Sequence, residues 1–333
     1  MEPSENLSRR PAVELVKEDT KQISLGDCMV PEIVCKLKKS DSDLWYHIKR
    51  YRYIINNPCW DKDTVFLLVL VVSDPRDFMT RDMYRKTCGS VKDVLGEKIK
   101  TVFVVGQTND SGVERGILAE NSEHRDIIKM TFIDTYKNFT LKTLLAMRWA
   151  IDYCAGAKFV LRCGHDVIAN YRQIIRYLKD LPKFKTETLF TGYLHSKGNS
   201  PFRNPKHKYY QSFRQYSGST YPAYLSGFAT VASFEFIRVL HSASFWKHLF
   251  IEDVYLATLA HENGIELVHN PNFWLTVPPK LKKDSCLLSM LLAIHKAPNF
   301  KFWSILYDLE KPRVVNCSQK QEIKMREKMQ GHM

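Results

Sequence analysis

The sequence predicts an α/β protein in which one mostly parallel, Rossmann-like sheet is flanked by helices. Residues 65–72 form a continuous apolar run rich in Val and Leu, which is typical of a strand buried on both faces of a parallel sheet. Shorter apolar runs recur along the chain, and charged segments with helical spacing separate them. The length of 333 residues suffices for one large α/β domain.

Further strands are expected at residues 101–105, 127–133, 158–161 and 189–193, and a last strand or extended segment at 265–277. The spacing of apolar side chains predicts helices over residues 78–95, 140–153, 168–181, 250–262 and 287–294. A strand, a helix and a strand in succession form a βαβ unit, whose connection is right-handed in nearly all proteins.

The chain is expected to have three parts. These are a stem-like segment over residues 1–60 that ends in one helix, a domain over 61–300, and a C-terminal extension over 301–333. Residues 318–333 alternate in charge, which is typical of a frayed helix or a disordered tail. Residues 197–219 are polar, basic and aromatic, and long excursions inside a compact domain are often functional.

The formal net charge of +13 is compatible with nucleic acid, anionic lipid or a phosphate-bearing small molecule as a partner. No zinc-finger spacing or aromatic RNA-binding signature accompanies it, so we expect no nucleic-acid partner. The eight cysteines contain no C-x-x-C pair, and their even number is compatible with disulfides. No apolar run reaches the roughly twenty residues of a membrane span. A signal-peptide pattern is not visible, so either the chain is soluble or an anchor is missing from this sequence.

Five segments occur in an order that is typical of one enzyme family. They are residues 81–89 (RDMYRKTCG), 102–106 (VFVVG), 126–149, which contain DTYKNFTLKT, 221–227 (YPAYLSG) and 252–255 (EDVY). Together, over residues 64–275, they resemble glycosyltransferase family 31, the β-1,3-galactosyl- and β-1,3-N-acetylglucosaminyltransferases. Cys88 stands where this family usually has tryptophan, and we expect it to be a small buried apolar residue.

The resemblance implies a GT-A fold, a UDP-sugar donor, manganese (Mn²⁺), a glycan or glycoprotein acceptor, and a β-1,3 linkage formed with inversion. It also implies a protein anchored in the Golgi membrane with its domain in the lumen, although no anchor is visible here and a soluble form is the alternative. A divalent cation neutralises a diphosphate leaving group, and an inverting displacement needs a base beside the acceptor hydroxyl.

The acidic metal motif of the family is altered in this chain. The family has three aspartates where this chain has Gly164, His165 and Asp166, directly after a predicted strand. Ligands of open α/β sheets bind at the carboxyl ends of strands. By position, Asp166 is the expected metal ligand, and Arg162 and His165 are expected beside the donor. The alternative is that Asp166 only caps the helix that follows.

By the same resemblance, Asp253 is the expected base, and Glu252 orients it or is the base itself. The alternative is that the dipole of a helix stabilises both acids in its first turn. The expected diphosphate partners are Arg81, Arg85 and Lys142, because guanidinium and ammonium groups fit phosphate. The residues expected near the sugar and the acceptor are Tyr221, Tyr224 and Gly227, where the alternative is a tight turn with core aromatics.

The leading hypothesis is a hexosyltransferase that moves galactose or N-acetylhexosamine from UDP to a glycan hydroxyl. Two alternatives stay open. Gly164 and His165 favour a non-catalytic member of the same fold that binds glycan or nucleotide. Gly164 and His165 are equally consistent with a metal-independent transferase, in which basic side chains replace the cation.

Overall fold

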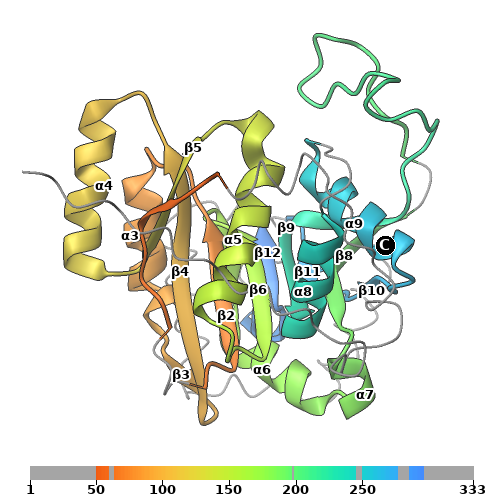
Figure 1. Ribbon diagram of the computed structural model, residues 1–333. Coiled ribbons are helices and arrows are strands. Elements are labelled where there is room, and N and C mark those ends of the chain that lie inside the picture. Colours follow the sequence, from red (N-terminus) through yellow and green to blue (C-terminus); the bar gives the residue numbers. More distant parts are fainter. Residues whose placement is uncertain (1–49, 60–63, 197–198, 245–249, 277–284, 296–333) are drawn as a thin grey trace, which may run out of the picture. The chain divides into compact units, whose positions relative to one another are not determined.

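The computed structural model describes residues 50–59, 64–196, 199–244, 250–276 and 285–295, and its centre is a nine-stranded sheet (Figure 1). The strand order is β1-β5-β4-β2-β6-β9-β8-β10, with β3 paired to β4. The neighbours β5, β4, β2 and β6 are parallel, whereas β9 is antiparallel to β6 and to β8. The strands are Tyr53–Ile55 (β1), Leu67–Val72 (β2), Asp93–Val94 (β3), Glu97–Gln107 (β4), Ile127–Ile133 (β5), Phe159–Gly164 (β6), Phe190–His195 (β8), Tyr224–Ser233 (β9) and Val268–His269 (β10). This arrangement confirms the predicted α/β class.

Alternate side chains of the central strands enter two cores, one on each face of the sheet. Leu67, Val69 and Val71 of β2 pack with α3, α4, α6 and α10. Leu68 and Leu70 pack with α5, α8 and α9 on the other face. The helices are Phe78–Lys86 (α3), Ser111–His124 (α4), Phe139–Tyr153 (α5), Tyr171–Asp180 (α6), Lys183–Thr186 (α7), Phe234–Ala243 (α8), Glu252–Glu262 (α9) and Ser285–Met290 (α10). The apolar run at 65–72 is therefore buried on both faces, as its composition predicts, and β2 occupies Leu67–Val72 of it.

A small second sheet corrects two of the predicted helices. It joins Phe273–Trp274 (β11), Ala293–His295 (β12) and Val167–Ala169 (β7). Because β7 pairs with β12, the helix expected over 168–181 begins only at Tyr171, and the helix expected over 287–294 ends at Met290. Asn170 caps α6, and its side chain accepts the Gln173 N–H at 3.0 Å.

The helix expected over residues 78–95 ends at Lys86. A short 3-10 helix, Cys88–Ser90, follows it, and β3 and β4 then form a tight hairpin. Both residues of the hairpin turn, Leu95 and Gly96, have positive φ values of 55° and 76°. Such a turn matches the twist of the two strands it joins, and the glycine adopts it without strain.

Only residues 50–59 of the stem-like segment are described. Tyr53–Ile55 form β1, antiparallel to β5, so the helix prediction is wrong at these residues. A disulfide joins Cys59 to Cys154, at the end of α5, and ties this segment to the domain. The rest of 1–60, the extension over 301–333 and the tail over 318–333 lie outside the described residues.

Candidate functional site

Most of the predicted site residues lie at one edge of the central sheet. The strands β2, β4, β5 and β6 are parallel, so their carboxyl ends meet there. The antiparallel strand β9 begins at the same edge, and it carries Tyr224 and Gly227. The first turn of α9 lies against Gly227. We call this part of the sheet the donor edge.

Arg162 and Glu252 form a buried ion pair at the donor edge. Arg162 Nη2 lies 2.9 Å from Glu252 Oε2, and the side chains are 4% and 3% exposed. The other terminal nitrogen of Arg162 donates to the Gly227 carbonyl. Burial raises the pKa of Glu252 to about 7, although the positive charge of Arg162 opposes the shift. Glu252 is therefore held in one position and is partly protonated near neutral pH.

Asp253 lies beside this pair and is held by backbone N–H groups. Its Oδ2 accepts the Gly227 N–H at 3.3 Å, and its Oδ1 accepts the Val254 N–H at 2.9 Å. Burial raises the pKa of Asp253, and these hydrogen bonds oppose the rise. A carboxylate with a raised pKa is a better proton acceptor at neutral pH than an ordinary one.

Gly227 is the position that lets both acids approach the strand. A Cβ at Gly227 would lie 3.2 Å from Glu252 Oε2 and 3.3 Å from Asp253 Cβ, which is tighter than most real contacts. The sequence predicts Gly227 near the sugar and the acceptor. In the structure, the groups that approach it are the two carboxyl-bearing side chains.

Aromatic side chains and one histidine surround Asp253. The ring of Tyr224 stacks on His195, with centroids 4.7 Å apart, and the charge of Asp253 acts on both residues. Tyr221 is 5% exposed, and its hydroxyl has no hydrogen-bond partner among the residues described. Burial raises the pKa of Tyr221 to about 12, so the hydroxyl remains a donor over the physiological range. The structure thus brings Tyr221, Tyr224 and Gly227 together around Asp253.

A cavity of about 560 Å³ opens where β4 and β5 end. It is lined by Arg76, Thr108, Asn109, Asp110, Ile133, Asp134 and Thr135. Lys142, which is buried, donates to Asp134 Oδ2 at 2.6 Å and to the Ser73 carbonyl at 2.5 Å. Asp134 also accepts the Gly106 N–H at 2.7 Å. Lys142 therefore supports one wall of the cavity, whereas the side chain of Arg76 is 58% exposed beside it.

Arg81 and Arg85 lie behind this wall in a network of ion pairs. Arg81 is fully buried and donates to Glu120, to Ser73 Oγ and to the carbonyls of Asp74 and Pro75. Arg85 pairs with Glu120 at 2.6 Å and with Asp126 at 2.8 Å. Both guanidinium groups are thus engaged by the protein itself. Arg81 holds the segment after β2, and Arg85 holds Glu120 and Asp126, so neither guanidinium group is a free cation in the cavity.

The altered metal motif forms two separate pairs. His165 Nε2 lies 3.2 Å from Asp77 Oδ2, and Asp166 Oδ2 lies 3.2 Å from His295 Nε2 on β12. Partial burial of Asp166 acts to raise its pKa, but the bond to His295 and the charge of His165 lower it. Oδ1 of Asp166 lies 2.7 Å from the position that a Cβ would take at Gly164, so the carboxylate folds back over the glycine.

Manganese prefers several oxygen ligands, and the described residues contain no group of three or more His, Cys, Asp or Glu side chains that could hold an ion. Asp166 and His295 are two such side chains in contact, which is fewer than a group of that kind needs. A diphosphate would have to supply further ligands, as is usual for cations bound with phosphate substrates. Asp166 lies before β7 and does not cap a helix, so the capping alternative is wrong.

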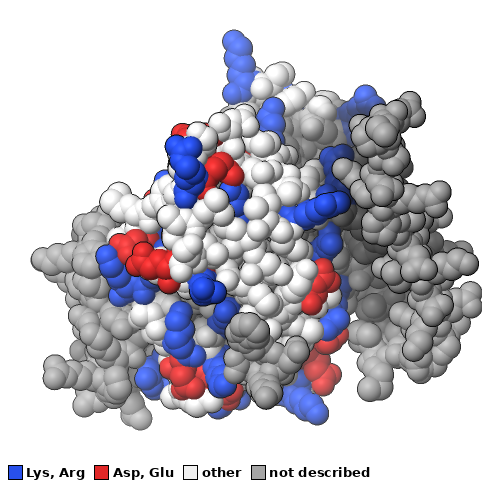
Figure 2. Space-filling model, turned by 60° about the vertical axis from the view of Figure 1, so that its left-hand side comes forward, with Lys and Arg blue, Asp and Glu red and all other residues white. Residues whose placement is uncertain are grey.

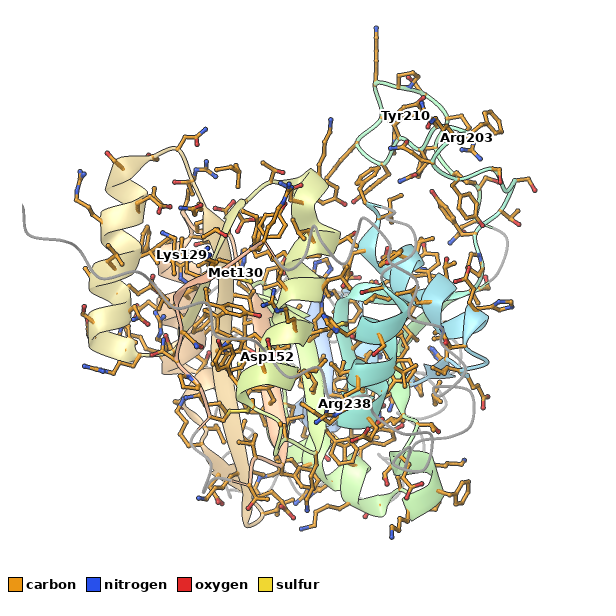
Figure 3. All side chains as sticks on the ribbon, viewed as in Figure 1. Lys129, Met130, Asp152, Arg203, Tyr210 and Arg238 are labelled. Atoms are coloured by element: carbon orange, nitrogen blue, oxygen red, sulfur yellow. A yellow bond between two sulfur atoms is a disulfide. The ribbon has the colours of Figure 1, made fainter. Side chains whose placement is uncertain are left out.

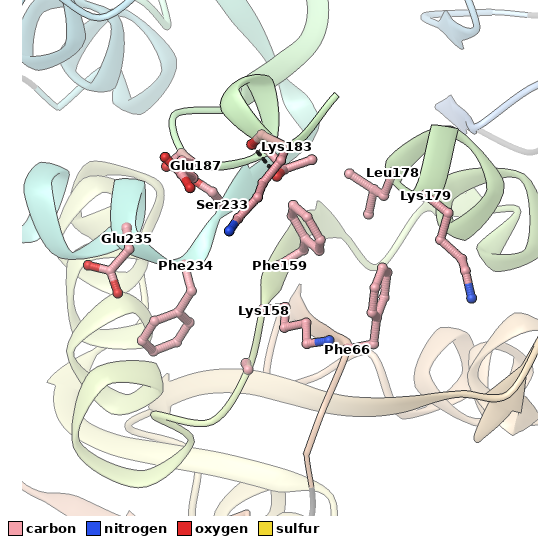
Figure 4. A pocket seen from close by; sticks show the side chains of 12 residues that line it. Phe66, Lys158, Phe159, Leu178, Lys179, Lys183, Glu187, Ser233, Phe234 and Glu235 are labelled. Atoms are coloured by element: carbon pink, nitrogen blue, oxygen red, sulfur yellow. Dashed lines mark hydrogen bonds between the residues drawn. The ribbon is translucent and has the colours of Figure 1, made fainter. Parts of the chain in front are cut away.

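A second cavity, of about 480 Å³, lies at the opposite edge of the sheet, where β2 and β6 begin (Figure 4). The rings of Phe66 and Phe159 are 5.2 Å apart in it, and Lys179 pairs with Glu97 at 2.8 Å. None of the predicted site residues lines this cavity. It is therefore separate from the donor edge.

Sequence reasoning missed four residues of the donor edge. They are Arg76, Tyr136, His195 and His295. His195 ends β8 and lies two residues after the strand predicted at 189–193. Because β8 runs parallel to β6, the end of that predicted strand was a usable signal. His295 reaches Asp166 only through the pairing of β12 with β7, for which the sequence gives no local signal.

On the face drawn in Figure 2, Lys and Arg side chains are interspersed with Asp and Glu side chains and with wide uncharged areas. The excess of positive charge is therefore not gathered into one patch on that face. Within the described ranges, the chain has no helix whose length and apolar character would let it cross a bilayer.

Sequence comparisons with known proteins agree on one family. A family model described as galactosyltransferase matches residues 79–271. Human β-1,3-galactosyltransferase 1 is 29% identical over 272 residues, which cover 80% of this chain and 81% of that protein. The lactosylceramide 1,3-N-acetyl-β-D-glucosaminyltransferase of Xenopus tropicalis is 31% identical over 74% of this chain and 67% of that protein. Form A of that enzyme from Xenopus laevis is 30% identical over 81% of both chains. Among solved structures, a glycosyltransferase involved in glycosylation of the major capsid of PBCV-1 is 9% identical, covers 74% of this chain and 98% of its own, and gives a TM-score of 0.37.

Proposed function

The chain belongs to the galactosyltransferase family, with an α/β fold of the GT-A type, and from this premise we propose that it is an inverting hexosyltransferase. It transfers galactose or N-acetylhexosamine from a UDP-sugar to a hydroxyl of a glycan or glycoprotein and forms a β-1,3 linkage. The observation that carries the proposal is Asp253, a half-buried carboxylate with a raised pKa, held by Gly227 among tyrosines at the donor edge.

Asp253 is proposed as the base. The acceptor oxygen bonds to the anomeric carbon, the bond from that carbon to the diphosphate oxygen breaks, and its electron pair leaves with UDP. Asp253 takes the proton of the acceptor hydroxyl. Glu252 is proposed as a positioning residue, because its carboxylate is buried and already paired with Arg162, whereas Asp253 is partly open to solvent.

The cavity beside β4 and β5 is proposed as the nucleotide site. Its lining offers the carboxylates of Asp110 and Asp134 and the amide of Asn109 to hydrogen-bonding groups of a base and a ribose. Arg76, whose side chain is mostly exposed, replaces Arg81 and Arg85 as the proposed partner of the diphosphate. Lys142, Arg162 and His165 support this site through their bonds to Asp134, Glu252 and Asp77.

Asp166 and His295 are the residues proposed to hold Mn²⁺. A bound divalent cation would neutralise charge on the diphosphate. With only two protein ligands, the affinity for the free ion is expected to be weak, and the bound donor should raise it. If basic side chains alone suffice, the chain is instead a metal-independent transferase.

Gly164 favours a second candidate function. This position has no carboxylate to bind a metal. The chain would then be a non-catalytic protein that binds nucleotide or glycan at the donor edge through Asp134 and the tyrosines but does not transfer a sugar. Measured turnover with any UDP-sugar excludes this candidate.

A Golgi lumenal location is also proposed. The Cys59–Cys154 disulfide supports it, because structural disulfides persist in oxidising compartments. The domain is proposed to occupy residues 61–300, together with β1 before it.

The direct test is a mass-spectrometric transfer assay with UDP-galactose, UDP-N-acetylglucosamine and UDP-N-acetylgalactosamine against a panel of β-galactoside and N-acetylhexosaminide acceptors. A product larger by one hexose or N-acetylhexosamine, with a β-1,3 bond by linkage analysis, is expected. If no donor gives product while UDP binds, the non-catalytic candidate replaces the transferase.

A further inference from the structure

An acid-free, aromatic loop lies beside the proposed base. No Asp or Glu occurs between Glu187 and Glu235, whereas five Lys and Arg residues do. The part of this stretch that leaves the sheet, residues 199–219, is called the basic loop here. In Figure 3 it rises above the sheet, with Arg203 and Tyr210 labelled on it.

The basic loop holds its own shape. Arg203 Nη1 donates to the Gln211 carbonyl at 2.8 Å, and its Nη2 donates to the Gly218 carbonyl at 2.7 Å, so one guanidinium ties both arms together. The same guanidinium lies 4.0 Å from the centroid of the Phe213 ring. A loop fixed in this way presents its side chains with little further ordering on binding.

Two tyrosines connect the basic loop to the proposed base. Tyr209 of the loop lies 6.0 Å from Tyr136, which precedes α5, and both rings are more than one third exposed. The charges of Asp253 and Glu252 act on Tyr136. Exposed tyrosine rings pack against the apolar faces of sugars. The two rings meet edge to face, at an interplanar angle of 60°, and their exposed parts offer a surface against which a sugar of the acceptor can pack near the base.

Lys208 places a positive charge on this surface. Its Nζ lies 4.3 Å from the centroid of Tyr136 and 5.3 Å from that of Tyr209. No acidic residue in the described ranges pairs with Lys208, Lys206 or Arg214. Lys208 is exposed, and its ammonium group, which lies beside two aromatic rings with no carboxylate on its own loop, can attract an anion.

We propose that the basic loop selects acceptor glycans that carry an anionic group, a sulfate or a sugar carboxylate, with Lys208 contacting the anion while Tyr136 and Tyr209 hold the adjacent ring. This inference rests on the proposed transferase function and names the class of its acceptor. Lys208 lies beside Tyr136 and Tyr209 and is not among the contacts of Asp253, so it is a specificity residue and not a catalytic one.

The test is binding to matched oligosaccharides, measured without turnover in the presence of UDP. The probes are N-acetyllactosamine, its 6-sulfated form and its glucuronic-acid-capped form. The sulfated or the carboxylated probe is expected to bind about tenfold more tightly than the neutral one, and added salt should reduce the difference. Comparison of the two acidic probes tells which anion is preferred.

Three variants decide whether Lys208 causes the preference. Lys208→Gln should abolish it, and Lys208→Arg should retain it. Lys183→Gln makes the same charge change on an exposed lysine at the opposite edge and should leave the preference unchanged. The inference is overturned if acidic and neutral probes bind equally, if none binds, or if the preference survives Lys208→Gln.

Two further measurements separate the possible failures. Transfer to neutral and acidic acceptors at equal efficiency would leave the transferase intact and refute the charge selection. Absence of transfer with a Lys208-dependent preference would refute the transferase and keep the anion site. Binding to vesicles of phosphatidylcholine with phosphatidylserine that depends on Lys208, with no oligosaccharide preference, would assign the loop to a membrane surface and overturn the inference.

Discussion

Arg162 Nη2 and Glu252 Oε2 lie 2.9 Å apart, with both side chains almost completely buried, and this pair joins the end of β6 to the start of α9. Because β6 ends in the altered metal motif and α9 carries Asp253, the pair holds the proposed donor and acceptor sides of the site together.

Loss of one partner of this pair should destabilise the fold. Arg162→Met is expected to lower the free energy of unfolding by about 3–5 kcal/mol, because Glu252 is left buried without a counter-charge. The double variant Arg162→Met/Glu252→Leu should recover most of the loss. Urea denaturation measures both. Lys86→Met, which breaks the exposed Lys86–Asp82 pair, is the control and should change stability by less than about 0.5 kcal/mol. Equal effects of Arg162→Met and Lys86→Met would refute a structural role for the buried pair.

Glu252 should make stability depend on pH. Its pKa is about 7 in the folded protein and 4.5 in the unfolded chain, so the folded state binds the proton more tightly. The contribution is complete below pH 4.5 and is lost as the pH rises through 7, by about 3 kcal/mol in total. Denaturation at several pH values between 5 and 9 should show this fall. In Glu252→Gln the fall should be much smaller, and an unchanged slope would contradict the assignment.

Asp166 and His295 should determine the response to manganese. Calorimetric titration of UDP with Mn²⁺ is expected to show affinity at least about tenfold higher than with a chelator. Asp166→Ala and His295→Ala should each remove the difference, and His165→Asn should preserve most of it because His165 bonds to Asp77. If the wild type binds UDP equally with manganese and with chelator, the metal-independent alternative is favoured.

The Cys59–Cys154 disulfide should stabilise the domain. It closes a loop of 95 residues, and its removal in the double variant Cys59→Ser/Cys154→Ser is expected to cost about 2–5 kcal/mol. Thermal denaturation of wild type and variant measures the loss. A variant as stable as the wild type would show that β1 and the end of α5 are held by packing alone.

The local pattern of apolar residues predicted most of the helices and strands. Several of the wrong predictions concern strands that form only by pairing with a segment far away in the sequence. The all-apolar strand β2 and the amphipathic helix α5 were predictable from local sequence. In each, the apolar residues that become buried lie within one short stretch of the chain. Val167–Ala169 and Ala293–His295 carry the same kinds of residue as the helices beside them, and only their mutual pairing makes them strands. Helix α4 was missed because Ile117 is its only fully buried residue, so its apolar stripe is weak.

In the candidate site, too, local motifs predicted some residues, whereas contacts between distant segments could not be predicted. Motif order selected Asp253, Glu252 and Gly227, because these residues lie in matching segments, and the structure brings the three into contact. Motif order could not show that Arg81 and Arg85 already bind the carboxylates of Glu120 and Asp126. Those acids lie in and after the missed helix α4, so the partners of the two arginines were not available to pattern reasoning.

The most direct test of the account compares Asp253→Asn with the wild type in the transfer assay. The amide cannot accept the proton, so turnover should fall by about 10²–10⁴-fold while UDP affinity and unfolding temperature stay the same. Asp152→Asn, at the exposed end of α5, is the matched control and should transfer at the wild-type rate. Wild-type turnover by Asp253→Asn would contradict the central claim that Asp253 is the base of an inverting hexosyltransferase.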